Sequence, residues 1–262
     1  MDIPGDGAEQ ARDYAAHDMR VLHFPKDYAV GELIERLSGD GPDSWTSFGE
    51  ARGPIGVPPD MQLGLWYDVD DLSPLAALQP DDLYSLNLIT TTVRDAELAH
   101  LRGLTGLRQL FLSGFPTITD RGLVYLGWLN DLQDLSLDGS EITDAGLIYL
   151  QDLTALRTLD LSFTGIDGTG LIHIRSATSL RELKLSDTLV DDTGAACLPQ
   201  FANLRSLRLD GTGITDAGLA HLARLTALEW LHLSGTKIST YGIAALRREL
   251  PRCHVYYNHS LS

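Results

Sequence analysis

The 262-residue sequence is short of cysteine and of basic residues, and both shortages exclude classes of protein. Its two cysteines, Cys197 and Cys253, are too few for a disulfide framework, which predicts free thiols and a reducing compartment. Lysine and arginine number 20 against 36 acidic residues, which gives a formal net charge of −16. Because this charge opposes binding to nucleic acid and to anionic membranes, we expect neither as a partner.

The sequence also lacks long apolar runs. No uninterrupted stretch approaches the ~20 apolar residues of a membrane-spanning helix. The first 20 residues contain neither a basic segment nor an apolar one, so we expect no signal peptide and a cytoplasmic location. Negative charge is concentrated at the front: residues 1–82 carry 17 acids and 5 bases, and residues 83–262 carry 19 and 15.

Internal repetition is what the sequence has in abundance. The segment ITDAGL at 142–147 recurs at 214–219, and blurred copies, IDGTGL at 166–171 and VDDTGA at 190–195, lie between them at 24-residue spacing. Aligning the copies gives seven units of 24 residues, one of which has an additional residue near GFPT. Each unit begins at a leucine: Leu83, Leu107, Leu132, Leu156, Leu180, Leu204 and Leu228. Cys253 is assigned to the start of an eighth unit.

Each unit combines two periods. The first half alternates, as in LRTLDLS at 156–162, where Leu159 and Leu161 share one face of a strand. The second half spaces apolar residues three apart, as at Leu171 and Ile174, which is typical of a helix. One strand and one helix cannot bury both apolar faces alone. The units are therefore expected to stack into a parallel inner sheet with an outer row of helices.

Three smaller features recur between strand and helix. A hydroxyl residue is expected to bond the turning backbone, pairs such as Thr143–Asp144 are expected to cap the helix, and a glycine is expected where a neighbouring unit packs too closely for a side chain. The hydroxyl residues are Thr91, Ser140, Thr164, Thr188, Thr212 and Thr236, and the glycines are Gly122, Gly146, Gly170, Gly194, Gly218 and Gly242.

This pattern resembles that of leucine-rich repeat proteins. The unit length and the ITDAGL segment are similar to the ribonuclease-inhibitor-like arrays, particularly the bacterial GALA-type arrays. The resemblance covers residues 83–257 and implies an α/β fold, a right-handed horseshoe-shaped solenoid. It also implies a binding surface, although such arrays bind many unrelated partners.

The chain divides into four segments. We expect a flexible acidic N-terminus over 1–20, a β-rich cap over 21–82, seven repeats over 83–252, and a closing strand and tail over 253–262. In 21–82, Gly and Pro turns separate short apolar runs, and Met61–Tyr67 is expected to add a strand ahead of Leu86. A cap would cover the open edge of the array, so we expect a monomer. A binding role for 21–82 remains an alternative.

Candidate binding residues lie between the strand leucines, because those positions face the concave surface and vary between units. We expect two patches: an acidic centre with Phe163 beside it, and a C-terminal patch that mixes charge with an aromatic. Trp230 is expected either to anchor a partner or to pack under the C-terminal segment CHVYYNH. The candidates are Phe111, Asp134, Asp138, Asp160, Phe163, Lys184, Arg208, Asp210, Trp230 and His232. Lys184, Arg208, Asp210, Trp230 and His232 are assigned to the C-terminal patch.

No catalytic, metal or cofactor site is expected. Ser206, Asp210 and His232 are the residue types of a hydrolytic triad, but an open sheet excludes little water and no nucleophile elbow is present. Helices lie about 8–10 Å apart, so one recurring helical position cannot supply a zinc ion whose ligands lie ~2.0–2.3 Å away. That position holds His100, Tyr125, Tyr149, His173, Cys197 and His221, which are expected to fill space.

The sequence therefore predicts a non-enzymatic protein that binds a protein or peptide on its concave face. Two alternatives remain. One is an inhibitor or immunity protein that blocks a basic enzyme or toxin by charge complementarity. The other is an accessory subunit of an enzyme encoded on another chain.

Overall fold

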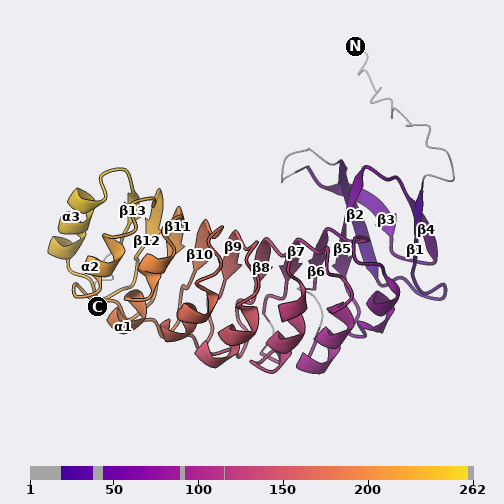
Figure 1. Ribbon diagram of the computed structural model, residues 1–262, viewed down its shortest axis with the longest axis horizontal. Helices are drawn as coiled ribbons and strands as arrows, with labels where there is room; N and C mark the ends of the chain where they lie inside the picture. The colour runs from indigo at the N-terminus through magenta and orange to yellow at the C-terminus, as the bar shows by residue number, and fades with distance from the viewer. Residues whose placement is uncertain (1–18, 38–43, 89–91, 115, 259–262) are drawn as a thin grey trace, which may run out of the picture.

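The computed structural model describes residues 19–37, 44–88, 92–114 and 116–258. Most of the expected flexible N-terminus and the last four residues of the tail lie outside these ranges. An 11-stranded sheet runs along the inner side of a shallow arc, and helical turns line the outer side (Figure 1). The strand order is β13-β12-β11-β10-β9-β8-β7-β6-β5-β2-β3.

Seven three-residue strands form the repeat part of this sheet. Neighbouring strands are parallel, and the paired leucines are 24 positions apart, as Leu159 and Leu183, except for Leu110 and Leu135, which are 25 apart. The strands are β6 (Ser85–Asn87), β7 (Gln109–Phe111), β8 (Asp134–Ser136), β9 (Thr158–Asp160), β10 (Glu182–Lys184), β11 (Ser206–Arg208) and β12 (Trp230–His232). They begin where the leucine spacing predicts, and the expected α/β leucine-rich repeat solenoid is confirmed.

The outer side consists mainly of 3₁₀ turns. They are η1 (Ser73–Ala77), η2 (Asp95–Leu101), η3 (Gly122–Trp128), η4 (Asp144–Leu150), η5 (Thr169–Ile174) and η6 (Leu198–Gln200). The α-helices are α1 (Asp192–Ala195), α2 (Leu219–Leu222) and α3 (Thr240–Glu249). A 3₁₀ turn rises about 2.0 Å per residue against 1.5 Å in an α-helix, so a few residues span the array. In the described ranges, no helix has the length and apolarity needed to cross a membrane.

The N-terminal region contributes three strands to the same sheet, β2 (Gly31–Leu37), β3 (Thr46–Glu50) and β5 (Met61–Tyr67). Its other two strands, β1 (Arg20–His23) and β4 (Pro54–Val57), pair with each other in a separate antiparallel sheet. β5 is antiparallel to β2 and parallel to β6, with Leu65 paired to Leu86. The strand expected at Met61–Tyr67 is therefore present, and the parallel sheet begins there, one strand ahead of the unit that starts at Leu83.

The C-terminal strand corrects one assignment. β13 (His254–Tyr256) pairs in parallel with β12, and Val255 lies opposite Leu231. This register places Arg252 where Leu228 stands in the preceding unit, and Cys253 one position later, opposite Glu229. In the sheet register Cys253 therefore lies one position past the predicted leading place. Its amide nevertheless donates to Leu250 as the amide of Leu228 donates to Leu225, and its side chain packs partly buried against the core.

The recurring hydroxyl residues bond the backbone, as predicted. Each donates to the carbonyl oxygen three residues before it: the distances are 2.5 Å for Ser140, 2.6 Å for Thr164, and 2.7 Å for Thr188, Thr212 and Thr236. Thr91 lies outside the described residues. These bonds satisfy carbonyl groups where the chain leaves the sheet.

The aspartates of the turns act differently from the prediction. The first residue of each pair caps its own helix: the Thr143 hydroxyl accepts from the Ala145 amide. The second reaches the next unit, so that the carboxylate of Asp120 accepts from the Thr143 amide at 2.8 Å and from its hydroxyl at 2.7 Å. The expectation that both residues cap their own helix is wrong for the second.

The glycine prediction is confirmed by the space around two of these glycines. A Cβ atom on Gly146 would lie 2.3 Å from an Asp120 carboxylate oxygen, and one on Gly194 would lie 2.1 Å from the Asp167 carbonyl oxygen. Both distances are shorter than any stable contact. Glycine is thus required where one unit's aspartate or backbone crosses the next unit.

Candidate binding face on the concave sheet

Parallel register arranges the concave side chains in straight rows across the strands. The middle row runs through Trp66, Asn87, Phe111, Ser136, Asp160, Lys184, Arg208, His232 and Tyr256. The neighbouring row ends with Trp230 and His254. The row therefore has an exposed aromatic at each end, Trp66 on β5 and Tyr256 on β13.

A hollow of about 240 Å³ lies in the middle of this face. Its lining consists of Phe111, Ser113, Asp134, Leu135, Ser136, Asp138, Thr158, Asp160 and Lys184, and we call it the acidic hollow. Five of the ten predicted binding residues line it. Phe111, a predicted binding residue that was assigned to neither patch, forms part of its wall.

Hydrogen bonds hold the carboxylates of the acidic hollow. Gln109 donates its side-chain amide to Asp134 at 2.9 Å, and the Ser136 hydroxyl donates to Asp138 at 2.7 Å. The Ser162 amide donates to Asp160 at 3.0 Å. The carboxylates are therefore oriented before any partner arrives.

Lys184 belongs to the acidic hollow rather than to the C-terminal patch, which corrects the sequence assignment. Its ammonium nitrogen lies 3.3 Å from an Asp160 carboxylate oxygen and 3.6 Å from one of Glu182. The reason is register, because Lys184 lies directly opposite Asp160 in the sheet. One lysine faces several carboxylates, so the region remains negative.

Phe163 follows β9 by three residues and is not among the residues that line the hollow. Its side chain is 61% exposed, and its backbone has φ of 57°. Left-handed backbone costs a non-glycine residue about 1–2 kcal/mol. The equivalent positions of four other units are glycines with positive φ, Gly114, Gly139, Gly211 and Gly235. In a fifth unit the equivalent residue is Asp187, with φ of 53°. A phenylalanine at a turn position that most units fill with glycine indicates a strained residue, and the sequence analysis did not use this signal.

Four rings stack at the C-terminal end of the concave face. The Trp230 and His254 ring centroids are 4.6 Å apart, and so are those of His232 and Tyr256. We call these four residues the aromatic ladder. Trp230 remains 41% exposed, so it stacks beside the closing strand instead of packing beneath it. His254 and Tyr256 were missed because their segment was interpreted only as a cap.

Two charged residues, Arg208 and Asp210, adjoin the ladder, and His232 within it is titratable. Arg208 is exposed and makes no ion pair with any described residue. Asp210 accepts a hydrogen bond from the Ser234 amide at 2.9 Å. Burial lowers the pKa of His232, and the charge of Arg208 lowers it further, against opposing effects of Asp210 and Glu182.

The residues of the possible triad do not assemble. Among the described residues, no hydrogen bond joins Ser206 to His232, and the Asp210 carboxylate bonds the Ser234 amide. No group of three or more His, Cys, Asp or Glu side chains in the described part of the chain is arranged to hold a metal ion. Cys197 and Cys253 are both free, and burial raises their pKa values, that of Cys253 to about 11.

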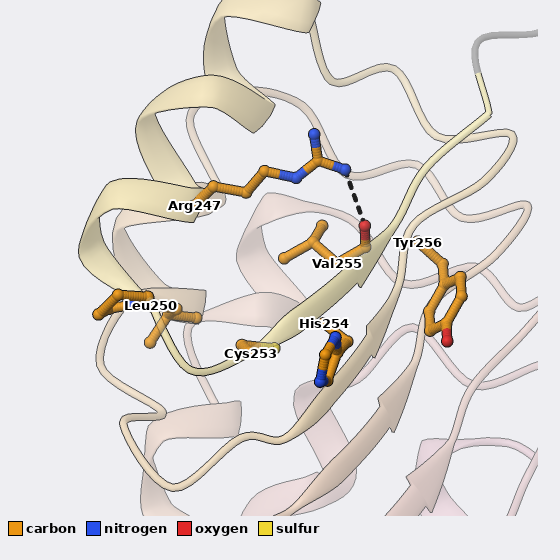
Figure 2. Close-up of a pocket in the computed structure, with 7 residues that line it drawn as sticks. Arg247, Leu250, Cys253, His254, Val255 and Tyr256 are labelled. Carbon is orange, nitrogen blue, oxygen red and sulfur yellow. Dashed lines mark hydrogen bonds between the residues drawn. The ribbon is translucent and has the colours of Figure 1, made fainter.

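A second hollow, of about 390 Å³, lies along the outer edge of β13 (Figure 2). His254 donates its amide to Glu229, and Tyr256 accepts from Leu233, so both face β12. The backbone N–H and C=O groups of Val255, which lies between them, face the open edge of the sheet, while its side chain is buried. Arg247 of α3 donates to the Val255 carbonyl oxygen at 2.9 Å. This guanidinium occupies an acceptor that a further strand would use.

Comparisons with known proteins agree with this architecture. The leucine-rich repeat family model matches residues 153–174, 176–198 and 202–223. An internalin C2 structure from Listeria monocytogenes is 25% identical with a TM-score of 0.62, covering 74% of this chain and 80% of the internalin chain. No curated protein sequence matches the chain.

Two further solved structures share the fold. Another internalin of L. monocytogenes is 22% identical with a TM-score of 0.55, covering 73% of this chain and 64% of that one. A leucine-rich repeat protein of Leptospira interrogans is also 22% identical, with a TM-score of 0.53, covering 70% and 44%. The chain thus spans less than two thirds of these two chains, and their likeness concerns the fold alone.

Proposed function

We propose that this chain, a leucine-rich repeat protein, binds a protein or peptide partner on its concave face. The observation that carries the proposal is the presence of two unlike chemical surfaces on one open sheet. The acidic hollow lies over β7–β10, and the aromatic ladder lies over β12 and β13. The repeat frame does not require either surface, because the leucines beneath them are buried whichever side chains face outward.

The size and chemistry of these surfaces support a macromolecular partner. At about 240 Å³, the acidic hollow is smaller than the ~300–1,000 Å³ typical of pockets that enclose a small molecule. It suits one basic side chain of a larger ligand. Tryptophan, tyrosine and arginine are enriched among interface hot spots, and Trp230, Tyr256 and Arg208 are all exposed here.

The more specific parts of the proposal are taken from the sequence analysis. The 24-residue offset between paired strands supports a ribonuclease-inhibitor-like or GALA-type array. We take the protein to be bacterial, monomeric and non-enzymatic, to need no cofactor, and to reside in the cytoplasm, where its free cysteines would stay reduced. Residues 21–82 serve as its cap, because β2 and β3 extend the sheet beyond β5.

An inhibitor of a basic enzyme or toxin is a second candidate. The net charge of −16 and the half-buried carboxylates that line the acidic hollow favour a basic partner. The distinguishing result is loss of the captured partner's activity on binding. A partner that stays active, or becomes more active, identifies an accessory subunit instead.

Affinity capture with matched variants tests the concave face. Trp230→Ala should weaken binding of the captured partner by about 2 kcal/mol or more, the usual scale of a hot spot. Trp128→Ala is the control, since Trp128 is 60% exposed on the outer turn η3. Trp230→Ala also removes ring stacking worth about 0.5–1.5 kcal/mol, so binding must be measured well below both melting temperatures. Equal binding by the two variants would refute concave-face recognition at Trp230.

A further inference from the structure

Charge changes sign along the concave face in a way that a binding partner would have to match. The strands β8, β9 and β10 present Asp134, Asp138, Asp160 and Glu182 against one cation, Lys184. That lysine is already paired with two carboxylates, at 3.3 and 3.6 Å. The centre of the face is therefore negative and requires a cation from outside.

Arg208 presents the opposite requirement one strand further along. It lies beside Lys184 in the sheet, is exposed, and has no carboxylate partner among the described residues. Asp210, two residues beyond the end of that strand, accepts a hydrogen bond from the Ser234 amide. A guanidinium presents a planar fork of donors that fits a carboxylate. Trp230 and His232 of the ladder lie on the next strand, so a carboxylate bound there would have rings beside it.

The spacing of these two surfaces selects the geometry of the ligand. The centre of the acidic hollow and Arg208 are separated by two to three strands, about 10–14 Å at ~4.8 Å per strand. An extended chain advances about 3.3 Å per residue. A segment that crosses the strands would thus place its two charges about three to four residues apart.

We propose that the concave face recognises one extended segment of a protein partner in which a lysine or arginine enters the acidic hollow and an aspartate or glutamate binds Arg208. An aromatic or apolar residue next to the acidic one packs against Trp230 or Tyr256. This inference rests on the proposed function, and it names the chemistry of the partner segment. Charge complementarity at two separate points gives the segment one direction along the sheet.

Selection from random peptides displayed on phage tests this chemistry directly. The immobilised full chain should enrich peptides with a basic and an acidic residue three to four positions apart. Asp134→Asn combined with Asp160→Asn should weaken these peptides about tenfold or more, which is about 1.4 kcal/mol, and should end selection for the base. Arg208→Gln should end selection for the acid while the base is retained. The matched outer-surface controls are Asp152→Asn and Arg175→Gln, at exposed positions.

The outcomes separate this inference from the proposed function. Enriched peptides that lose affinity with Trp230→Ala but lack the charge spacing overturn only the inference, and so does the absence of any enriched peptide. Peptides that bind the wild type, Trp230→Ala and both charge variants equally attach elsewhere. If the captured protein partner behaves in the same way, the proposed function also fails.

Discussion

Asp144 provides the most informative test of how one repeat unit is joined to the next. Its carboxylate accepts three backbone amides of the following unit: Asp167 at 2.6 Å, Gly168 at 3.1 Å and Gly170 at 2.6 Å. Gly168 and Gly170 are buried, whereas Asp167 is exposed. Removing the carboxylate leaves two buried amides without a partner, because water replaces it only at Asp167.

The expected loss for Asp144→Ala follows from those two amides. A buried polar group without a partner costs about 1–3 kcal/mol, so for two amides the free energy of unfolding should fall by roughly 2–6 kcal/mol. One kcal/mol shifts the melting temperature of a chain of this size by about 2–4 °C, so calorimetry should show a decrease of roughly 4–24 °C. Hydrogen exchange at the Gly168 and Gly170 amides should also be faster in Asp144→Ala than in the wild type.

Two matched variants isolate the cause. Asp120→Ala removes the equivalent carboxylate one unit earlier, where both bonds go to exposed groups of Thr143, and should cost only about 0.5–1.5 kcal/mol. Asp144→Asn keeps the oxygen that serves both glycines and loses only the Asp167 bond, so its cost should lie near that of Asp120→Ala. If Asp144→Ala and Asp120→Ala melted at the same temperature, buried amides would not explain the coupling between units.

Three further predictions concern the edge, the thiols and Phe163. Arg247→Ala should expose the outward carbonyl of Val255 and cause self-association in sedimentation experiments, whereas its exposed neighbour Arg248→Ala should stay monomeric. Cys253, with its pKa raised to about 11, should alkylate slowly in the native protein at pH 8 and quickly after denaturation. Because the unfolded thiol ionises first, its contribution to stability should be lost as pH rises from about 9 towards 11. Phe163→Gly should raise the free energy of unfolding by about 0.5 kcal/mol, since relief of ~1–2 kcal/mol of backbone strain exceeds the ~0.5–1 kcal/mol entropy cost of glycine. Fast native alkylation, or destabilisation by Phe163→Gly, would contradict these arguments.

The fold could be predicted from sequence because its causes repeat. Each strand leucine meets the same neighbours as the leucine one unit away, so the strand positions followed from spacing alone. The lateral role of Asp120 and Asp144 could not be predicted in the same way. A capping pattern is defined within one unit, whereas these side chains bond the next one. Any reasoning that treats units singly misses bonds between them.

The candidate site was predictable by residue but not by grouping. Seven of the ten predicted residues lie on strands of the sheet, and Asp138, Phe163 and Asp210 follow a strand within three residues. Lys184, however, was grouped with Arg208 because of its charge, whereas its register places it opposite Asp160. Tyr256 was missed because the closing strand was treated as a cover, although it lies in register with His232. Both errors come from classifying residues by chemistry before applying the register of the sheet.

Almost everywhere in this chain, the residues that hold the fold and the residues that face solvent occupy separate positions. Phe163 combines the two, because it stands at a turn position and has an exposed side chain. Leucines, turn hydroxyls and lateral aspartates hold the array, while the side chains between the leucines face outward and change without altering the frame. Phe163 occupies a turn position that four other units fill with glycine, and its ring is largely exposed. Such strain persists where the surrounding structure over-determines the conformation. The Phe163 amide donates to the Ser186 carbonyl oxygen at 2.9 Å, and Asp187, the equivalent residue of the next unit, has a similar φ of 53°. The array itself therefore holds the strained backbone of Phe163, and Phe163→Gly tests whether relief of that strain stabilises the fold.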